Sequence, residues 1–167
     1  MKLIPLFLLT ILLAGCTTTH PMRQKLHGDI DRLKIGSVTT RWHFAAAHGL
    51  YDLYFDLMSD DAVFMGTDAT ERWTKAEFME YAREPFADGE GWTYTPSDQH
   101  IAFSADRQTA WIDEILKNEK YGTLRGTGVL VNDDGSWKIA HYSLTFLVPN
   151  AKAEQVVELI AIPSTDP

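Results

Sequence analysis

The fold is decided by residues 109–147, which read TAWIDEILKN EKYGTLRGTG VLVNDDGSWK IAHYSLTFL. Apolar and polar residues alternate in three runs of this stretch, which is the two-residue period of half-buried β-strands. The links between the runs are short, and one of them is the turn sequence Asn132-Asp133-Asp134-Gly135. Short links of this kind join antiparallel neighbours. The sequence therefore predicts an antiparallel meander with strands at 109–116, 124–131 and 137–147.

Glycines in the middle strand predict that this sheet bends. Gly126 and Gly128 both fall within the run 124–131, and glycine inside a strand marks a bulge or a strong bend. Upstream, the same two-residue period predicts a fourth strand at 92–103, interrupted near Pro96, and a short apolar run predicts a strand at 62–65. The residues between that short strand and the next helix, 66–72, are expected to form a loop.

Helical spacing precedes the strands. Residues 38–58 carry two adjacent apolar stripes at spacings of three and four, so we expect one long, heavily buried helix with Ser37 as its N-cap. A second helix begins at a capping box formed by Thr74 and Glu77. It is expected to end before Pro85, because the residue before a proline disfavours helical geometry.

The end of the chain predicts a third helix at 150–160, with Val156, Val157 and Ile160 turned toward the domain. Helices followed by a run of strands indicate the α+β class rather than a doubly wound sheet. We expect a cone-shaped domain, in which a strongly bent antiparallel sheet wraps around the long N-terminal helix. The second and C-terminal helices complete it, and a cavity lies at its open end.

The first sixteen residues predict a lipoprotein signal. Lys2 gives a positive start, an apolar run follows, and Leu13-Ala14-Gly15-Cys16 closes it. This is the layout of a signal peptide, and the run is shorter than the roughly 20 apolar residues that a membrane-spanning helix needs. The ending resembles the lipobox of bacterial lipoproteins, which implies cleavage after Gly15 and a lipid, such as palmitate, on Cys16. The alternative is an ordinary secretory signal with a chance cysteine.

This interpretation divides the chain into a signal peptide at 1–15, a lipidated tether at 16–36 and a domain at 37–162. Thr17 stands where inner-membrane lipoproteins of the usual type carry aspartate. The resemblance therefore implies a lipid anchor in the cell envelope, on the periplasmic face of the outer membrane. Cys16 is the only cysteine of the chain, so no intrachain disulfide is expected.

The charge balance narrows the range of partners. The full chain carries a formal net charge of −8, and loss of residues 1–15 removes Lys2 and leaves 14 basic and 23 acidic side chains, a balance of −9. An acidic surface argues against nucleic acid as a partner. It also argues against electrostatic attachment to anionic lipid. Attachment to the membrane would then depend on the acyl chains of Cys16.

Several strings in the domain carry a family resemblance. They are DDAVFMG at 60–66, ERWT at 71–74, AWIDE at 110–114, RGTGVL at 125–130 and WKIAHYSL at 137–144. In this order they resemble the SnoaL-like branch of the nuclear transport factor 2-like (ketosteroid isomerase-like) superfamily over residues 38–160. The resemblance implies an α+β cone with one central pocket, often in a homodimer. It implies no single activity, because the fold hosts isomerases, cyclases, dehydratases and binding modules.

The resemblance also implies which strand faces point into the cone, namely those that bear Asp113, Thr127 and His141. Strand alternation places Arg125 and Ser143 on the same faces. Asp113, His141 and Arg125 could then perform acid–base catalysis, because a carboxylate fixes the tautomer of an imidazole and raises its pKa. The alternative is a satisfied buried network in which Asp113 and Arg125 pair with each other.

Aromatic residues are expected to form the rest of the pocket wall. Trp42 on the long helix and Trp111 on a strand should face inward, and Trp73 and Glu71 should lie at the mouth. An aromatic wall suits a flat apolar ligand, with Thr127 and Ser143 as polar contacts. By its parity, Glu114 is expected to face outward or to lie at an interface.

The sequence predicts neither a metal site nor a cofactor. His43 and His48 are five residues apart, whereas zinc-binding histidine pairs on a helix are four apart, and they are expected to be packing or surface groups. No glycine-rich phosphate loop or nucleophile elbow is present. The positions of the ketosteroid isomerase base and oxyanion donors are taken by Gly66, Trp42 and about Thr127, so the resemblance does not carry that mechanism over.

We therefore expect a lipid-anchored domain that binds a small, largely apolar ligand in a central pocket. Two alternatives stay open. One is an acid–base enzyme of the hydrolase or lyase type that uses Asp113, His141 and Arg125. The other is a dimerising interaction module that binds no ligand.

Overall fold

The computed structural model describes the backbone of residues 21–161 and the side chains of residues 28–161. The predicted signal peptide and the lipidation site Cys16 lie outside the described residues. Two helices come first, a third lies between the second and third strands, and a fourth ends the described chain. The elements are α1 (Pro21–Ala47), α2 (Tyr51–Asp56), β1 (Met58–Met65), β2 (Arg72–Thr74), α3 (Lys75–Ala82), β3 (Thr95–Phe103), β4 (Thr109–Asn118), β5 (Gly122–Asp133), β6 (Ser136–Phe146), a 3-10 turn (Asn150–Lys152) and α4 (Ala153–Ala161). None of the described helices is long and apolar enough to cross a membrane.

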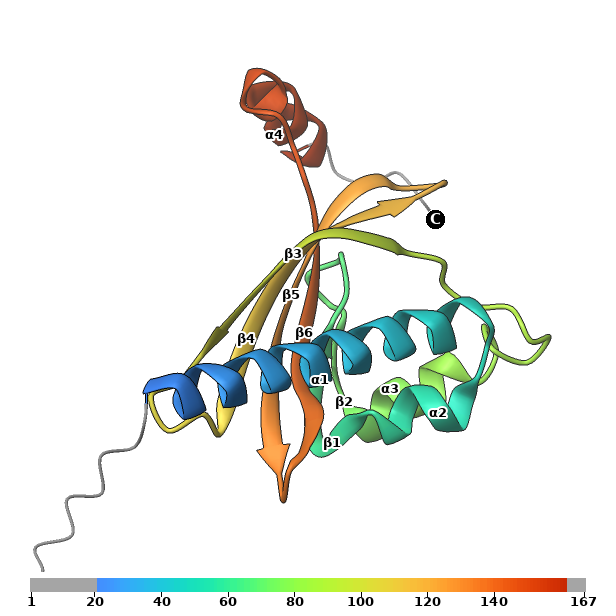
Figure 1. Ribbon diagram of the computed structural model, residues 1–167. Helices are drawn as coiled ribbons and strands as arrows, with labels where there is room; N and C mark the ends of the chain where they lie inside the picture. The colour runs from blue at the N-terminus through green and yellow to red at the C-terminus, as the bar shows by residue number, and fades with distance from the viewer. Residues whose placement is uncertain (1–20, 162–167) are drawn as a thin grey trace, which may run out of the picture.

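The strands form one bent sheet in the order β2-β1-β6-β5-β4-β3, and α1 crosses its inner face (Figure 1). The α+β cone is therefore confirmed, and β3 to β6 pair as the predicted antiparallel meander. The expectation of a wholly antiparallel sheet is wrong, because β1 pairs parallel with β6. A parallel pair needs a long crossover, and the chain between β1 and β6 provides it. Short-range sequence pattern carries no signal for such a distant pairing.

The long helix expected at 38–58 is two helices. Gly49 separates α1 from α2 with φ of +58°, a left-handed backbone conformation that glycine adopts without the steric penalty of a side chain. A Cβ at this position would also meet the backbone carbon of Gly89 at 2.9 Å. The turn lets α2 fold back beside the sheet. The helix also starts earlier than expected, since Ser37 lies within α1 rather than at its N-cap.

The early part of α1 is held against the sheet by charged and apolar contacts. Arg107 donates to the Asp31 carboxylate at 3.1 Å and lies over the ring of Phe103 at 4.2 Å from its centroid. Ile35 is fully buried. The second half of the predicted tether is therefore helical and packed.

Helix α3 begins as the sequence predicts. The Thr74 side chain accepts from the backbone N–H of Glu77, and the Glu77 carboxylate accepts from the backbone N–H of Thr74. Two of the unpaired amide groups at the start of the helix are satisfied in this way. The short strand β2, which falls partly in the predicted loop, ends at this cap. The arrangement fixes the position of the loop between β1 and β2.

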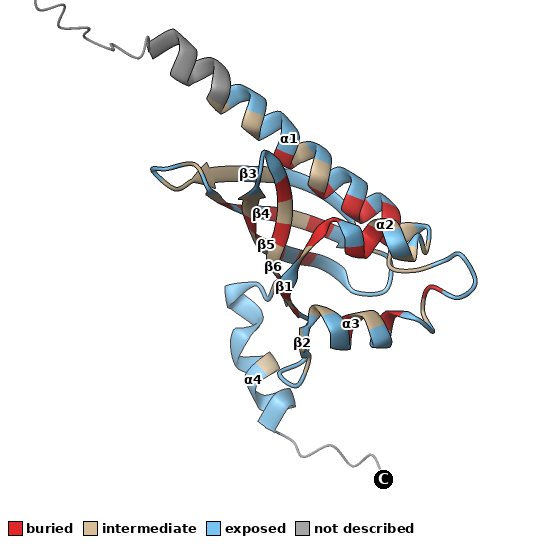
Figure 2. Cartoon of the chain, turned by 90° about the horizontal axis from the view of Figure 1, so that it is seen from below, coloured by how far each residue is buried: buried red, intermediate tan, exposed pale blue. Residues whose placement is uncertain are grey.

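The C-terminal helix does not pack as predicted. Val157 is 65% exposed and Ile160 is 76% exposed, and α4 stands away from the domain with an exposed surface (Figure 2). The sequence pattern correctly predicts an amphipathic helix, but most of the apolar face that should cover the domain is exposed. The inner face of the sheet is covered by α1 instead.

Candidate functional site

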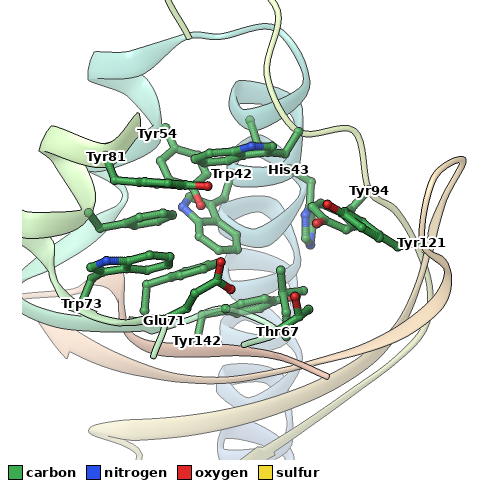
Figure 3. Close-up of a pocket in the computed structure, with 16 residues that line it drawn as sticks. Trp42, His43, Tyr54, Thr67, Glu71, Trp73, Tyr81, Tyr94, Tyr121 and Tyr142 are labelled. Carbon is green, nitrogen blue, oxygen red and sulfur yellow. The ribbon is translucent and has the colours of Figure 1, made fainter. Parts of the chain in front are cut away.

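One cavity opens at the wide end of the cone, between α1, the inner face of the sheet and α3. Its volume is about 120 Å³, and most of the residues in its wall are aromatic. The aromatic residues that line it are Trp42, Tyr54, Phe64, Trp73, Phe78, Tyr81, Trp92, Tyr94, Tyr121 and Tyr142. We call this space the central cavity; the side chains around it are drawn in Figure 3.

Stacked rings make the wall rigid. Phe64 and Phe78 stack with ring centroids 4.0 Å apart, and Phe78 lies parallel to Trp92 at 5.6 Å. Trp73 stacks on Tyr81 at 4.8 Å. Such aromatic pairs are worth about 0.5–1.5 kcal/mol each beyond the area that they bury. The wall is therefore set by the fold before any ligand arrives, which reduces the entropy lost on binding.

A buried carboxylate lies beside this wall. Glu114 on β4 is 1% exposed, and three side chains donate hydrogen bonds to it. His43 Nε2 and the Tyr142 hydroxyl contact Oε1 at 2.8 and 2.6 Å, and Gln99 Nε2 contacts Oε2 at 2.9 Å. Because the donors come from α1, β6 and β3, the network joins the central helix to three strands.

The network stabilises the charged form of Glu114. Burial raises the pKa of this carboxyl, but the hydrogen bonds from His43, Tyr142 and Gln99, with the attraction to the His43 ring, outweigh burial and lower the pKa overall. Burial raises the pKa of Tyr142, and the neighbouring Glu114 charge raises it further. Tyr142 is therefore a neutral donor, and Glu114 is an anion at neutral pH.

His43 connects the network to the cavity. Its ring lines the central cavity, and Nε2 is held on Glu114. Among the described residues no hydrogen bond engages the other ring nitrogen, Nδ1. With Nε2–H donated to a carboxylate, the neutral ring carries its lone pair on Nδ1.

Glu71 is the second carboxylate of the cavity. The loop from β1 to β2 folds the Glu71 side chain over Gly66, where an added Cβ would come within 2.1 Å of Glu71 Oε2. That oxygen accepts from the backbone N–H of Asp68 at 3.1 Å. In Figure 3 the carboxylate points into the central cavity, among the aromatic side chains.

The sheet turns the opposite face inward from the one that the resemblance implies. Asp113, Arg125 and Thr127 are exposed on the outer face, and Trp111 is 49% exposed there. Asp113, Thr127 and Ser143 do lie in one row across β4, β5 and β6, but the row faces away from the cavity. The predicted inward placement of these residues is therefore wrong.

His141 is likewise on the outer side. Burial lowers its pKa, with a smaller contribution from the positive charge of Arg72. The register slips between Val129 and Leu130, which leaves Ala140 as the unpaired residue of a bulge. Parity reverses at such a residue, so Trp137 and Ile139 face inward before it and Tyr142 faces inward after it. No ion pair joins Asp113 to Arg125 in the described chain, so the alternative of a buried pair is also wrong.

Trp42, Trp73 and Glu71 do line the central cavity. Their contact with a ligand stays a prediction. Sequence reasoning missed His43 and Glu114, although one signal was present. Glu114 shares its strand face with Ala110, Ile112 and Leu116, all of which are buried, and a lone charge in an apolar row requires a partner. Among the described residues, no group of three or more potential ligands lies close enough together to hold a metal ion.

Comparison with known proteins agrees with this architecture. The family described as "SnoaL-like domain" matches residues 35–149. An NTF2-like protein with a cystatin-like fold from Novosphingobium aromaticivorans is 14% identical, with a TM-score of 0.61 over 86% of this chain and 99% of that one. A candidate scytalone dehydratase from the same organism is 14% identical, with a TM-score of 0.60 over 72% and 87%. An NTF2-like protein from Cytophaga hutchinsonii is 20% identical, with a TM-score of 0.57 over 70% and 98%. None of the curated proteins compared with the chain matches it.

Proposed function

The chain belongs to the SnoaL-like domain family, and from that premise we propose that it binds a small, flat, largely apolar ligand in the central cavity. One observation carries this proposal: ten aromatic side chains, several of them stacked in pairs, line a cavity of about 120 Å³. An apolar cavity of roughly 150 Å³ is enough to hold benzene in another protein. The cavity therefore suits a single ring, with the rest of the ligand extending through the open mouth.

Intrinsic fluorescence tests this proposal, because three of the lining residues are tryptophans. Titration with single-ring compounds such as phenol and benzyl alcohol should quench or shift the emission and saturate. Trp73→Ala removes one wall of the cavity and should weaken binding by about tenfold, since one lost aromatic contact is worth about 1–1.5 kcal/mol. Trp111→Ala is the matched control, because Trp111 lies on the outer face. Equal loss in both variants, or no saturable signal, would contradict the proposal.

Native mass spectrometry of protein extracted from its own membrane gives an independent test. A tightly held ligand should appear as a mass difference that disappears on denaturation. We expect this difference to be absent from Trp73→Ala and retained by Trp111→Ala.

A second candidate function is acid–base catalysis, and the geometry of His43 favours it. A carboxylate that accepts from one nitrogen of an imidazole fixes the tautomer and leaves the lone pair of the other nitrogen free to accept a proton, as general-base catalysis requires. The residues would be His43 as base and Glu114 as the group that positions it. This replaces the set Asp113, His141 and Arg125, which lies outside the cavity.

Deuterium exchange tests the catalytic candidate without a known substrate. A base in an aromatic cavity should accelerate exchange of the protons next to the carbonyl of small cyclic ketones, followed by NMR in heavy water. His43→Gln should reduce the enzyme-dependent rate by about a hundredfold or more, and His141→Gln should leave it unchanged. If wild-type protein adds nothing to the buffer rate, the protein is a binding module for this class of compound.

We also propose that the domain is tied to the membrane by a lipid on Cys16. The lipobox-like sequence Leu13-Ala14-Gly15-Cys16 supports this. The excess of acidic over basic residues supports it indirectly, since it makes adhesion of the protein to an anionic bilayer unfavourable.

A further inference from the structure

We infer that the ligand of the central cavity is an organic cation, whose ammonium group lies at the mouth between Glu71 and the surrounding aromatic rings. This inference rests on the proposed binding function and adds the charge of the ligand. It comes from a relationship that neither the family nor its structural neighbours assign, namely a carboxylate turned into an aromatic enclosure that has no basic partner for it.

The Glu71 carboxylate has unused capacity to accept hydrogen bonds. A carboxylate offers about four acceptor positions, and the described structure fills one of them, with the backbone N–H of Asp68 at 3.1 Å. None of the ion pairs in the described chain includes Glu71. Its side chain is half-buried and points into the cavity rather than into solvent (Figure 3).

The rings around the mouth provide the second half of a cation site. The cavity that Glu71 lines is also lined by Trp73 and Tyr81 on one side of it and by Tyr94 and Tyr121 on the other (Figure 3). The face of an aromatic ring carries negative partial charge, so an ammonium group within about 6 Å of a ring centroid is attracted to it. Several rings around one carboxylate combine that attraction with a full opposite charge.

The tyrosines remain neutral and already respond to the carboxylate. Burial raises the pKa of Tyr94 to about 12, and the neighbouring Tyr121 phenol and Glu71 carboxyl group add to it. Burial likewise raises the pKa of Tyr81, and Glu71 again adds to it. The negative charge of Glu71 therefore acts on the tyrosines around the mouth, and it favours a positively charged group there.

Among the residues that the structure describes, no other group that lines the cavity neutralises the charge of Glu71. Neither lysine nor arginine is among the residues that line it. The basic side chain that does line it, His43, is already held on Glu114. The chain as a whole carries a net charge of −8, which adds a long-range attraction for cations.

A neutral ligand would bind less favourably at this site, because it would desolvate Glu71. An apolar group that enters the mouth removes water from Glu71 and offers no hydrogen bond or charge in return, which is costly. An ammonium group replaces the lost water with charge-assisted hydrogen bonds or a contact ion pair. An anion would face repulsion from both Glu71 and the ring faces.

Two probes of nearly the same shape test the inference, namely benzylammonium and benzyl alcohol. With wild-type protein at neutral pH and physiological salt, we expect benzylammonium to bind about tenfold more tightly than benzyl alcohol. This factor is the gain in affinity expected from one charge that is paired in an aromatic site. Phenyltrimethylammonium, which cannot lose its charge, should show the same preference at every pH tested. Titration calorimetry or tryptophan fluorescence measures both.

Substitution of Glu71 tests whether its carboxylate causes the preference for the cation. Glu71→Gln should remove the preference by weakening benzylammonium alone, with the affinity for benzyl alcohol equal or higher. Glu84→Gln is the matched control, because it removes the same charge from an exposed position outside the cavity, and it should keep the preference.

The outcomes distinguish the inference about the charge of the ligand from the proposed binding function. If benzyl alcohol binds as tightly as benzylammonium to wild-type protein, the inference about charge is wrong and the binding function stands. If neither probe binds, both are wrong. Should Glu71→Gln fail to fold, the comparison of the two probes on wild-type protein still decides the question.

Discussion

Tyr142 lies across Gly126 so closely that a Cβ at position 126 would come within 1.9 Å of the tyrosine oxygen. The same oxygen donates the 2.6 Å hydrogen bond to Glu114. The glycine therefore does more than bend β5, because it leaves the space in which the Tyr142 ring reaches the buried carboxylate. Gly128 repeats this relationship one position along the inner face, where a Cβ would meet Tyr142 at 2.9 Å.

Gly126→Ala should therefore displace Tyr142 and break its bond to Glu114. We expect a loss of about 2–3 kcal/mol in the free energy of unfolding, from overpacking together with a weakened buried hydrogen bond. Urea denaturation measures it. Thr127→Ala is the control, since Thr127 is exposed on the opposite face and should change stability little. A Gly126→Ala protein as stable as wild type would show that Tyr142 can move without cost.

Glu114→Gln tests the buried network through pH. The folded protein lowers the pKa of Glu114 below its ordinary value of 4.5, so the stability that this group provides is present above that value. The stability is lost as pH falls through the lower folded pKa. At pH 7 the variant should be less stable by about 2–4 kcal/mol, because charge-assisted hydrogen bonds to a buried group are lost.

The acid limb of the stability curve gives the second readout for Glu114. Wild-type protein should lose stability steeply below about pH 4.5, and Glu114→Gln should show a shallower loss over the same range. Asp113→Asn, one residue away on the outer face, should keep the wild-type slope. Parallel curves for wild type and Glu114→Gln would mean that other carboxyl groups dominate acid unfolding.

The meander was predictable because its signals are local. Alternation marks each of the strands, and the Asn132-Asp133-Asp134-Gly135 turn lies between two of them as expected, with Asp134 and Gly135 both at positive φ. The capping box of α3 is equally local, since Thr74 and Glu77 are three residues apart. These features depend on a few neighbouring residues and on nothing distant.

The inward face of the sheet was not predictable in the same way. Each face of β4 carries apolar residues, with Ile112 on one side and Trp111 and Ile115 on the other, so alternation alone leaves the direction open. The buried Glu114 makes the inner face look polar, and its partner His43 comes from a helix 71 residues away. Trp42 was predicted correctly because it lies in an apolar stripe of helical spacing, and size alone is no guide, since Trp111 is 49% exposed on the outer face.

His141 should make stability depend on pH near neutrality. Burial and Arg72 lower its pKa in the folded protein, so the unfolded chain binds a proton first as pH falls. The stability contributed by the neutral ring is full above its ordinary pKa of 6.5 and decreases as pH falls through the folded value. His141→Gln should flatten the curve between about pH 7 and pH 5, whereas His48→Gln, in the exposed turn that follows α1, should not. An unchanged slope would show that the partly exposed ring feels too little of its surroundings to matter.

Removal of the proposed lipid site should release the protein from the membrane. Cys16→Ser eliminates the group that would carry the acyl chain, and the acidic mature chain has little electrostatic attraction to anionic lipid. We expect wild-type protein to partition into the detergent phase and Cys16→Ser into the aqueous phase, with a mass difference that corresponds to acylation. Wild-type protein that partitions into the aqueous phase would indicate an ordinary secretory signal.

The outer face of the sheet is where we expect a second copy to bind. It exposes Trp111 at 49%, and Met65 is also exposed on the same side. An exposed tryptophan on a sheet face is typical of an interface. Trp111→Glu should convert a dimer to a monomer in sedimentation velocity, because it replaces a large apolar contact with a charge that the interface would bury. Trp73→Ala, which alters the cavity instead, should leave the dimer intact. Wild-type protein that sediments as a monomer at all concentrations would contradict this expectation, while the ligand proposal would be unaffected, since it is argued from residues of a single chain.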